Sequence, residues 1–150
     1  SQHSRLMNPF TGQKDYGFVP RIAGTPQQAP RVPVILPFGR HCEGQSGFGA
    51  THILERHRNM LLGSVMRDVR GVANFVAIAL RHGACLHWAA CWEGKCRITA
   101  YRQGVAEVVL EYNEKHGAAF WTVVTAFPAS SCDGDVIGRL TPVSIPSPTR

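Results

Sequence analysis

The chain has 150 residues, of which 44% are hydrophobic and 17% are charged. This size and composition fit one globular domain with its own core and exclude an intrinsically disordered chain. Lys and Arg number 16 against 10 Asp and Glu, and the resulting formal net charge of +6 favours a polyanionic partner such as nucleic acid, an acidic protein or a membrane surface. No apolar run reaches the roughly 18 residues that would predict a membrane-spanning helix.

The N-terminal region has an unusual composition. Residues 1–40 are rich in Pro, Gly, Gln and Arg, and proline recurs too often for a helix and interrupts any strand. We therefore predict a linker or wrapping arm at residues 1–40, with one short extended piece at residues 32–36. The body of the domain is predicted at residues 41–138, and the Pro-rich residues 139–150 are predicted to form a loose tail. The start of the chain has neither an initiator Met nor an apolar signal segment, which indicates a piece of a longer protein.

Two helices are predicted after residue 50. The first has Thr51 as its N-cap and Gly63 as its stop. Its apolar face recurs at the helical period and consists of Ile53, Leu54, His57 and Leu61. The second begins at a Ser64 cap, follows a stripe of valines and ends at His82.

From residue 85 the hydrophobic period changes from 3.6 to about 2, which is the period of a strand. Strands are predicted at Cys85–Trp92 and at residues 97–101, 105–112 and 119–127, separated by turns that contain glycine. Helices followed by a meander of strands predict an α+β fold. In this fold the N-terminal helices pack on an antiparallel sheet of about four strands, and the other sheet face is open to a substrate.

The five cysteines do not suggest a metal site or a full set of disulfides. Their odd count argues against a complete disulfide framework, and the spacing between Cys91 and Cys96 is too wide for the usual zinc pair. We interpret them as small buried hydrophobes, with a Cys91–Cys96 disulfide as the alternative. No cofactor is predicted.

The segment from Gly47 to His57 carries the candidate chemistry, because it places two histidines and an arginine behind a glycine-rich approach. RNA can be cleaved without a metal when its 2′-hydroxyl attacks the neighbouring phosphorus. The protein must then supply a base, an acid and positive charge for the crowded phosphorane, and imidazole and guanidinium groups provide them. A small ribonuclease that leaves 2′,3′-cyclic phosphate and 5′-hydroxyl ends is therefore the leading hypothesis.

Within this segment the two histidines are not equivalent. His52 and Arg56 are four residues apart and share the polar face of the predicted helix, beside Gly49 and a helix start whose free amides attract phosphate. The alternatives are an ordinary surface or capping histidine and a solvated arginine. His57 falls on the inward face, where a hydrogen-bonded core histidine explains the spacing as well as catalysis does. His41, in the preceding loop, is interpreted as a loop histidine without a role.

Side chains of the predicted sheet add candidates for binding. Arg97, Thr99 and Tyr101 alternate onto one strand face, which suits phosphate and base contacts, although a plain solvent-facing side is the alternative. Thr125 is predicted to share a face with Trp121, Val123 and Phe127. Its hydroxyl could bind a phosphate oxygen, or it could be an ordinary strand threonine.

The motifs Gly-Phe-Gly-Ala-Thr-His-Ile-Leu-Glu-Arg-His and Trp-Thr-Val-Val-Thr-Ala-Phe-Pro, at either end of a helix and a meander, resemble the barnase–EndoU–colicin–RelE (BECR) class of ribonucleases. The likeness is closest to toxin domains at the C-termini of contact-dependent inhibition proteins and other bacterial polymorphic toxins. The resemblance implies His52 and His57 as the acid and base, with Arg56 and Thr125 nearby. Arg97 and Tyr101 match by their place in the meander only.

The resemblance also implies a biological setting. Such domains are metal-independent endoribonucleases, several of which cleave tRNA. They are secreted or delivered from the cell surface as part of a larger protein, act in the cytoplasm of a target cell and are neutralised by a cognate immunity protein. The charge of +6 predicts that this partner is acidic. The chain lacks the Val-Glu-Asn-Asn motif that often precedes these toxins, so no delivery route is predicted.

Two other functions stay open from the sequence. A non-catalytic RNA-binding module would use the same basic sheet face. A toxin of different chemistry, such as an NAD glycohydrolase, would share the size and charge. A zinc deaminase fits poorly, because the chain has no H-x-E paired with P-C-x-x-C.

Overall fold

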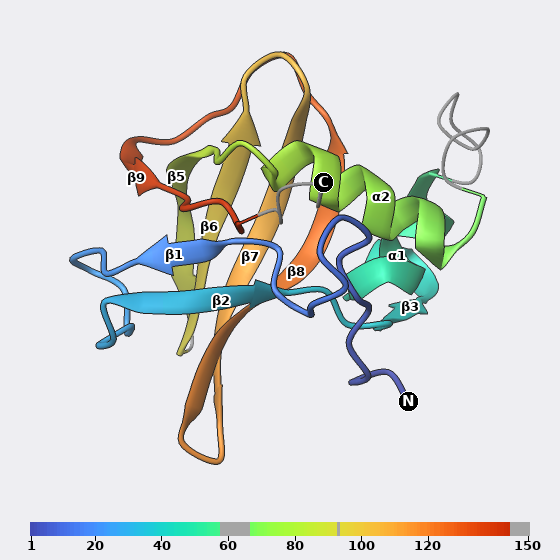
Figure 1. The fold of residues 1–150 in the computed structure, drawn as a ribbon, viewed down its shortest axis with the longest axis horizontal. Helices are drawn as coiled ribbons and strands as arrows, with labels where there is room; N and C mark the ends of the chain where they lie inside the picture. Colours follow the sequence, from blue (N-terminus) through green and yellow to red (C-terminus); the bar gives the residue numbers. More distant parts are fainter. Residues whose placement is uncertain (58–66, 93, 145–150) are drawn as a thin grey trace, which may run out of the picture.

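The structure is a computed structural model that describes residues 1–57, 67–92 and 94–144. Figure 1 shows long curved strands, with α2 lying across them. In chain order the elements are β1 (Phe18–Pro20), β2 (Arg31–Ile35), β3 (Arg40–Cys42), η1 (Glu43–Gln45), β4 (Ser46–Phe48), α1 (Gly49–His57), α2 (Val69–Leu80), β5 (Cys85–Trp92), β6 (Lys95–Arg102), β7 (Ala106–Lys115), β8 (Ala118–Pro128) and β9 (Val136–Arg139).

The main sheet has seven strands in the order β1-β2-β8-β7-β6-β5-β9, and β3 and β4 form a separate hairpin. Every neighbouring pair in the main sheet is antiparallel except β2 and β8, which run parallel. The sheet nearly closes on itself, because Phe18 and Thr141 exchange two backbone hydrogen bonds of 2.8 and 2.9 Å between its two edges.

The predicted α+β fold, with N-terminal helices on a four-stranded antiparallel sheet, is therefore wrong. The described residues are mostly β, with 43% strand and 18% helix, and contain only two α-helices. The strands predicted between residues 85 and 127 are present, and β5 has the predicted bounds. The prediction failed because the sheet contains three more strands: β1 and β2 come from the segment whose composition indicated a linker or wrapping arm, and β9 crosses the predicted boundary between body and tail.

The Pro-rich N-terminal region is part of the core. β2 pairs in parallel with β8, so that Val34 lies opposite Trp121, and both side chains are fully buried. Gln27, itself buried, accepts a hydrogen bond of 2.8 Å from Nε1 of Trp121 and donates one of 2.9 Å to the carbonyl of Val19. Such pairings between distant segments leave no trace in local periodicity, which is why composition alone indicated a linker or wrapping arm.

The first helix starts earlier than predicted and the second starts later. α1 begins at Gly49, ahead of the expected Thr51 cap. α2 is capped by Asp68, whose carboxylate accepts a 2.9 Å hydrogen bond from the amide of Gly71. The predicted stop at Gly63 and cap at Ser64 lie outside the described residues. No helix in the described ranges is long and apolar enough to cross a membrane.

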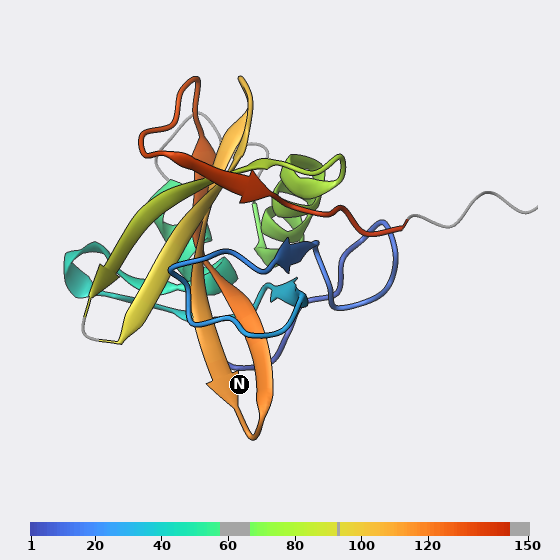
Figure 2. The ribbon, with the colours of Figure 1, turned by 90° about the vertical axis from the view of Figure 1, so that its left-hand side faces the viewer.

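The main sheet has two different faces. Val72, Val76 and Leu80 of α2 belong to the same buried cluster as the strand residues Ile98 and Val108, so this core face is covered by α2. The opposite face, which we call the polar face, carries Arg97, Thr99, Tyr101 and their cross-strand partners. Figure 2 shows α2 on one side of the curved strands and the β3–η1–β4 hairpin on the other.

A β-bulge decides which face Thr125 occupies. Val109 lies opposite Thr125, but the next residue of β7, Leu110, lies opposite Val123, so Val124 is an extra residue in β8. Thr125 is therefore on the polar face, in the same cross-strand row as Thr99. The prediction that Thr125 shares a face with Trp121 and Val123 was wrong, because strict alternation does not foresee a bulge.

Candidate functional site: a basic cleft beside a histidine pair

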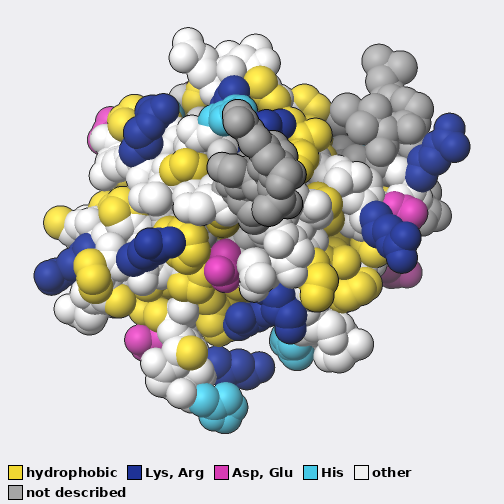
Figure 3. All heavy atoms as spheres, in the orientation of Figure 1, with side chains coloured by type: hydrophobic (Ala, Val, Ile, Leu, Met, Phe, Trp, Pro, Cys, Tyr) yellow, Lys and Arg dark blue, Asp and Glu magenta, His cyan; other side chains and the backbone are white. Residues whose placement is uncertain are grey.

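A cleft of about 680 Å³ opens between the polar face, the β3–β4 hairpin and the N-terminal segment. We call it the basic cleft, because its positive side chains outnumber the two carboxylates, Glu111 and Glu114. Figure 3 also shows Lys, Arg and His side chains gathered along the lower edge of the molecule, below β2. The positive side chains that line the cleft are Arg5, Arg40, Lys95, Arg97 and Lys115, with His3 at its margin.

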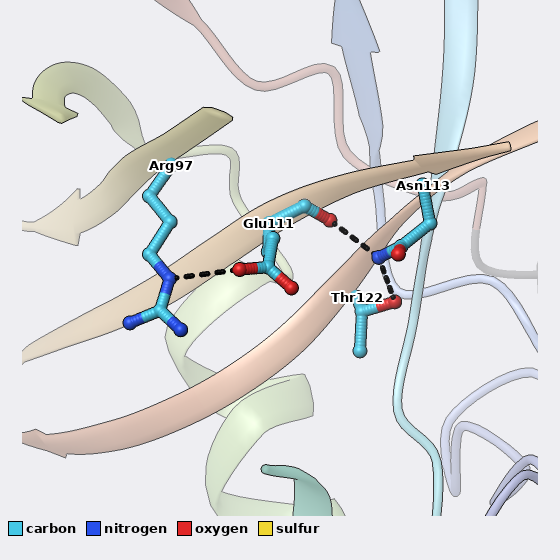
Figure 4. A network of polar contacts seen from close by, with 4 residues as sticks. All are labelled: Arg97, Glu111, Asn113 and Thr122. Atoms are coloured by element: carbon cyan, nitrogen blue, oxygen red, sulfur yellow. Dashed lines mark hydrogen bonds and ion pairs between the residues drawn. The ribbon is translucent and has the colours of Figure 1, made fainter. Parts of the chain in front are cut away.

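Polar contacts hold the floor of this cleft in place (Figure 4). Arg97 donates from Nε to a carboxylate oxygen of Glu111 at 3.1 Å, across the β6–β7 pair. Asn113 donates to the backbone carbonyl of Glu111 at 3.1 Å and to the hydroxyl of Thr122 at 2.9 Å. Arg97, about one third exposed, is thus oriented by its neighbours and does not sweep freely through the solvent.

Two histidines meet close to this cleft, next to its lining residue Gly47, although neither of them lines it. His41 on β3 and His52 on α1 place their Nδ1 atoms 3.0 Å apart, with their rings stacked. Gly47, opposite His41 in the hairpin, makes this approach possible, since a Cβ there would lie 2.9 Å from Nδ1 of His52. One of the two Nδ1 atoms must carry the hydrogen, so the two rings share one proton position between them.

The spacing with Arg56 predicted that His52 lies on the polar, solvent-facing side of the helix. The structure instead buries His52, whose side chain is only 3% exposed. The pKa of His52 is lowered from 6.5 to about 4, first by burial and then by the nearby charges of His41, Arg56, His57 and Arg97, in that order of importance. Because Arg97 contributes to this shift, His52 lies within electrostatic reach of the basic cleft. At neutral pH the imidazole of His52 is uncharged and able to accept a proton.

The other two candidates on α1 have different surroundings. His57 is 4% exposed, and its Nε2 donates to the carbonyl of Ala126 at 2.8 Å, which ties α1 to β8. This is the hydrogen-bonded core position that the inward spacing allowed. Arg56 is exposed.

The start of α1 is not an open anion site. The amides of Ala50 and Thr51 donate to the carbonyls of Pro37 and Phe38 at 3.0 and 2.8 Å. Gly49 has a φ of +79°, and a Cβ there would lie 2.6 Å from the carbonyl oxygen of Pro37. Gly49 is therefore needed for close packing of the backbone, and the expected phosphate contact at these amides is blocked.

The candidates on the sheet are divided between two places. Arg97 lines the basic cleft, whereas Tyr101 lines a second cleft at the other end of the polar face. Thr99 and Thr125 are nearly buried in the row between them. The hydroxyl oxygen of Thr125 has no hydrogen-bond partner among the described residues, which is unusual for a buried polar atom.

Sequence reasoning missed His41 and most of the positive side chains of the basic cleft. His41 was set aside because nothing in its local pattern indicates a hairpin that folds back onto α1. Arg5 and Arg40 were placed in an arm outside the domain body, while Lys95 and Lys115 are the terminal residues of β6 and β7, next to hairpin turns. Across residues 1–57, 67–92 and 94–144, no group of three or more His, Cys, Asp or Glu side chains is placed to hold a metal ion. The alternative Cys91–Cys96 disulfide depends on the Cys91 side chain, which lies outside the described part of the chain.

The fold and the site define a mostly β domain with a basic cleft and a buried imidazole pair. No protein-family model matches the chain, and neither a curated protein nor a solved structure does. Function must therefore be argued from the site itself.

Proposed function

We propose that the protein is a metal-independent endoribonuclease that cleaves RNA, with tRNA as its substrate class, by attack of the 2′-hydroxyl on the adjacent phosphate. The observation that carries the proposal is the pair of imidazoles with Nδ1 atoms 3.0 Å apart, whose buried member is uncharged at neutral pH, beside a cleft lined by five Lys and Arg side chains. Acid, base and positive charge are the three requirements of this reaction.

The hydrogen bond between the two imidazoles suggests which histidine is the general base and which is the general acid. When His52 donates from Nδ1 to His41, its Nε2 is a base that removes the proton of the 2′-hydroxyl. The 2′-oxygen forms a bond to phosphorus, the bond to the 5′-oxygen breaks, and that oxygen takes a proton from Nε2 of His41. In the same step one proton passes from Nδ1 of His52 to Nδ1 of His41, so that His41 gains a proton as it gives one and both rings end uncharged. In this assignment His41 takes the place that the family resemblance gave to His57.

The positive side chains of the basic cleft would bind the phosphate of the substrate. Arg97, held by Glu111, presents a fixed guanidinium to the polar face, and such groups bind phosphate oxygens through charge-assisted hydrogen bonds. A bound phosphate also opposes the charges of Arg56 and Arg97 that lower the pKa of His52. Substrate binding would thus raise that pKa toward the range in which a general base is most effective. The unpartnered hydroxyl of Thr125 adds a donor on the same face.

The resemblance to polymorphic toxins supplies the setting of the proposal. The domain would be secreted or delivered from the cell surface within a larger protein, act in the cytoplasm of a target cell and be held inactive by an acidic immunity protein. A partner that covers the basic cleft would need carboxylates to match its excess of positive charge. An immunity protein encoded next to the parent gene should bind the purified domain, and its binding should weaken in high salt.

The decisive experiment incubates the purified chain with tRNA and total RNA in EDTA and maps the ends of the products. We expect cyclic-phosphate and 5′-hydroxyl ends, and loss of cleavage in His52→Ala and His41→Ala. His116→Asn is the matched control, because His116 is exposed in the β7–β8 turn and its φ of 52° suits asparagine. Salt-dependent binding without cleavage would support the non-catalytic module instead. Turnover of NAD in a parallel incubation would support the other toxin chemistry.

A further inference from the structure

A second cleft, of about 640 Å³, lies at the other end of the polar face from the basic cleft. It is not used in the proposed cleavage chemistry. Its walls come from the segment between α2 and β5, from β5, β6 and β9, and from the segment that precedes β9. The side chains most relevant to a ligand are His87, Tyr101, Arg102, Gln103, Ser131 and Arg139.

The sheet register aligns the two clefts. Tyr101 and Arg139 are both cross-strand partners of Cys85, so they stand in one row of the polar face. Arg97 is four residues before Tyr101 on β6, which at about 3.3 Å per residue places the two rows roughly 13 Å apart. Thr99 and Thr125 occupy the row between them. A chain of phosphates that leaves the basic cleft along this face therefore arrives at the second cleft.

The aromatic wall of the second cleft is held in a fixed position. The hydroxyl of Tyr101 accepts a hydrogen bond of 3.1 Å from the amide of Gly104. Nδ1 of His87 donates to the carbonyl of Gly134 at 3.0 Å, and its ring meets the Tyr101 ring edge-on with 5.8 Å between centroids. A fixed aromatic side chain beside positive charge is the usual platform on which single-stranded RNA stacks a base.

The charges in this cleft are available to a ligand. Arg102 is half-buried and Arg139 is exposed, and neither guanidinium forms an ion pair with any residue that the structure describes. Arg97 differs, because Glu111 already balances its charge. Two guanidinium groups without a carboxylate partner, next to serine hydroxyls and a glutamine amide, match a phosphate together with the polar edge of a base.

We propose that the second cleft binds a nucleotide that flanks the cleaved one on the same single-stranded RNA, with its base against Tyr101 and its phosphate at Arg139 and Arg102. The substrate is then an extended loop or unpaired end, and a paired helix does not fit, since the base must be unstacked to reach Tyr101. This inference rests on the proposed ribonuclease function for the position of the cleaved bond.

The test measures binding separately from cleavage. Fluorescently labelled 2′-O-methyl RNA of about eight nucleotides, which lacks the attacking hydroxyl, is titrated with the intact chain at several salt concentrations. We expect Tyr101→Leu to weaken binding about tenfold. Arg139→Gln should make the slope of log K against log salt less negative by about 0.7, the change expected for one lost phosphate contact on a single strand.

Arg70→Gln is the matched control, because Arg70 is exposed on α2, which covers the opposite face of the sheet. Equal urea midpoints for the variants and the parent chain show that all are folded. If Tyr101→Leu and Arg139→Gln bind like the parent, or if Arg70→Gln loses as much, the second cleft is not on the RNA path. If the binding pattern appears in a chain that cleaves no RNA, the cleft assignment stands and the proposed cleavage fails. If the chain cleaves RNA but the binding pattern is absent, the proposed cleavage stands and the assignment of the second cleft fails.

Discussion

His41 and His52 meet with 3.0 Å between their Nδ1 atoms, although one is on a hairpin strand and the other on the following helix. This contact joins a half-exposed imidazole to one that is almost fully buried. The buried ring is kept uncharged at neutral pH by its surroundings, and it lies within electrostatic reach of Arg97 in the basic cleft.

The first prediction concerns stability and pH. The pKa of His52 is lowered from 6.5 to about 4 in the folded chain, so between these pH values the unfolded chain binds more protons. The free energy of unfolding should therefore fall as the pH falls from about 6.5 to 4, with a slope of at most about 1.4 kcal/mol per pH unit from this group. Urea unfolding at a series of pH values measures it. His52→Gln should flatten the slope, and His116→Asn should leave it as it is; an unchanged slope in His52→Gln would mean that His52 is not kept uncharged.

The second prediction concerns Gly47, whose lack of a side chain allows His41 and His52 to come into contact. A Cβ at Gly47 would collide with the carbonyl oxygen of Arg40 and lie 2.9 Å from Nδ1 of His52. Gly47→Ala should separate the two imidazoles, and NMR titration should show the pKa of His52 moving back toward 6.5. Gly44→Ala, in the same hairpin, is the control, since its φ of +80° causes strain but its Cβ meets nothing within 4 Å. Gly44→Ala should cost about 1 kcal/mol and leave the titration of His52 unchanged. The same titration curve in both variants would contradict a special role for Gly47.

The third prediction separates stability from activity at Thr125. Its buried hydroxyl oxygen lacks a partner in the described structure, and a buried unsatisfied group destabilises a fold by about 1–3 kcal/mol. Thr125→Val should therefore be as stable as the parent chain or more so, while RNA cleavage falls. Thr125→Ser should keep the activity. A Thr125→Val protein that cleaves RNA at the parent rate would assign Thr125 to packing alone.

The fourth prediction concerns the orientation of Arg97. Glu111→Gln removes a negative charge from the basic cleft and also loosens the 3.1 Å contact that holds the guanidinium. RNA binding should tighten at low salt because the cleft becomes more positive, whereas kcat should fall because Arg97 is less well placed. Glu114→Gln makes the same change in charge at a carboxylate that contacts Tyr112. It should tighten binding without lowering kcat, and equal kcat values in the two variants would rule out a positioning role for Glu111.

The fifth prediction tests whether the Pro-rich region is part of the folded unit. Gln27→Leu leaves the indole N–H of Trp121 and the carbonyl of Val19 without their buried partner. The free energy of unfolding should fall by about 2 kcal/mol or more. Gln28→Leu is the control, because Gln28 is an exposed neighbour and should change stability by less than about 0.5 kcal/mol. Equal stability of the two variants would mean that this region is only loosely attached.

Local patterns were sufficient for part of the fold. Alternation of apolar residues located β5 to β8, because each of these strands pairs with its neighbour in sequence through a short turn. The inward spacing of His57 correctly allowed a buried, hydrogen-bonded ring. These features depend on contacts within a few residues or across one hairpin, and such contacts leave a periodic signal in the chain.

The sequence by itself determined a basic chain with a run of antiparallel strands and a histidine-rich segment ahead of them. Only the tertiary structure decided that Val34 pairs beside Trp121, that a bulge turns Thr125 to the polar face, and that His41 and not His57 reaches His52. Each of these depends on packing between segments that are distant in sequence or on one extra residue in a strand. Neither cause alters the local period of hydrophobicity, so neither could be seen before the chain was folded.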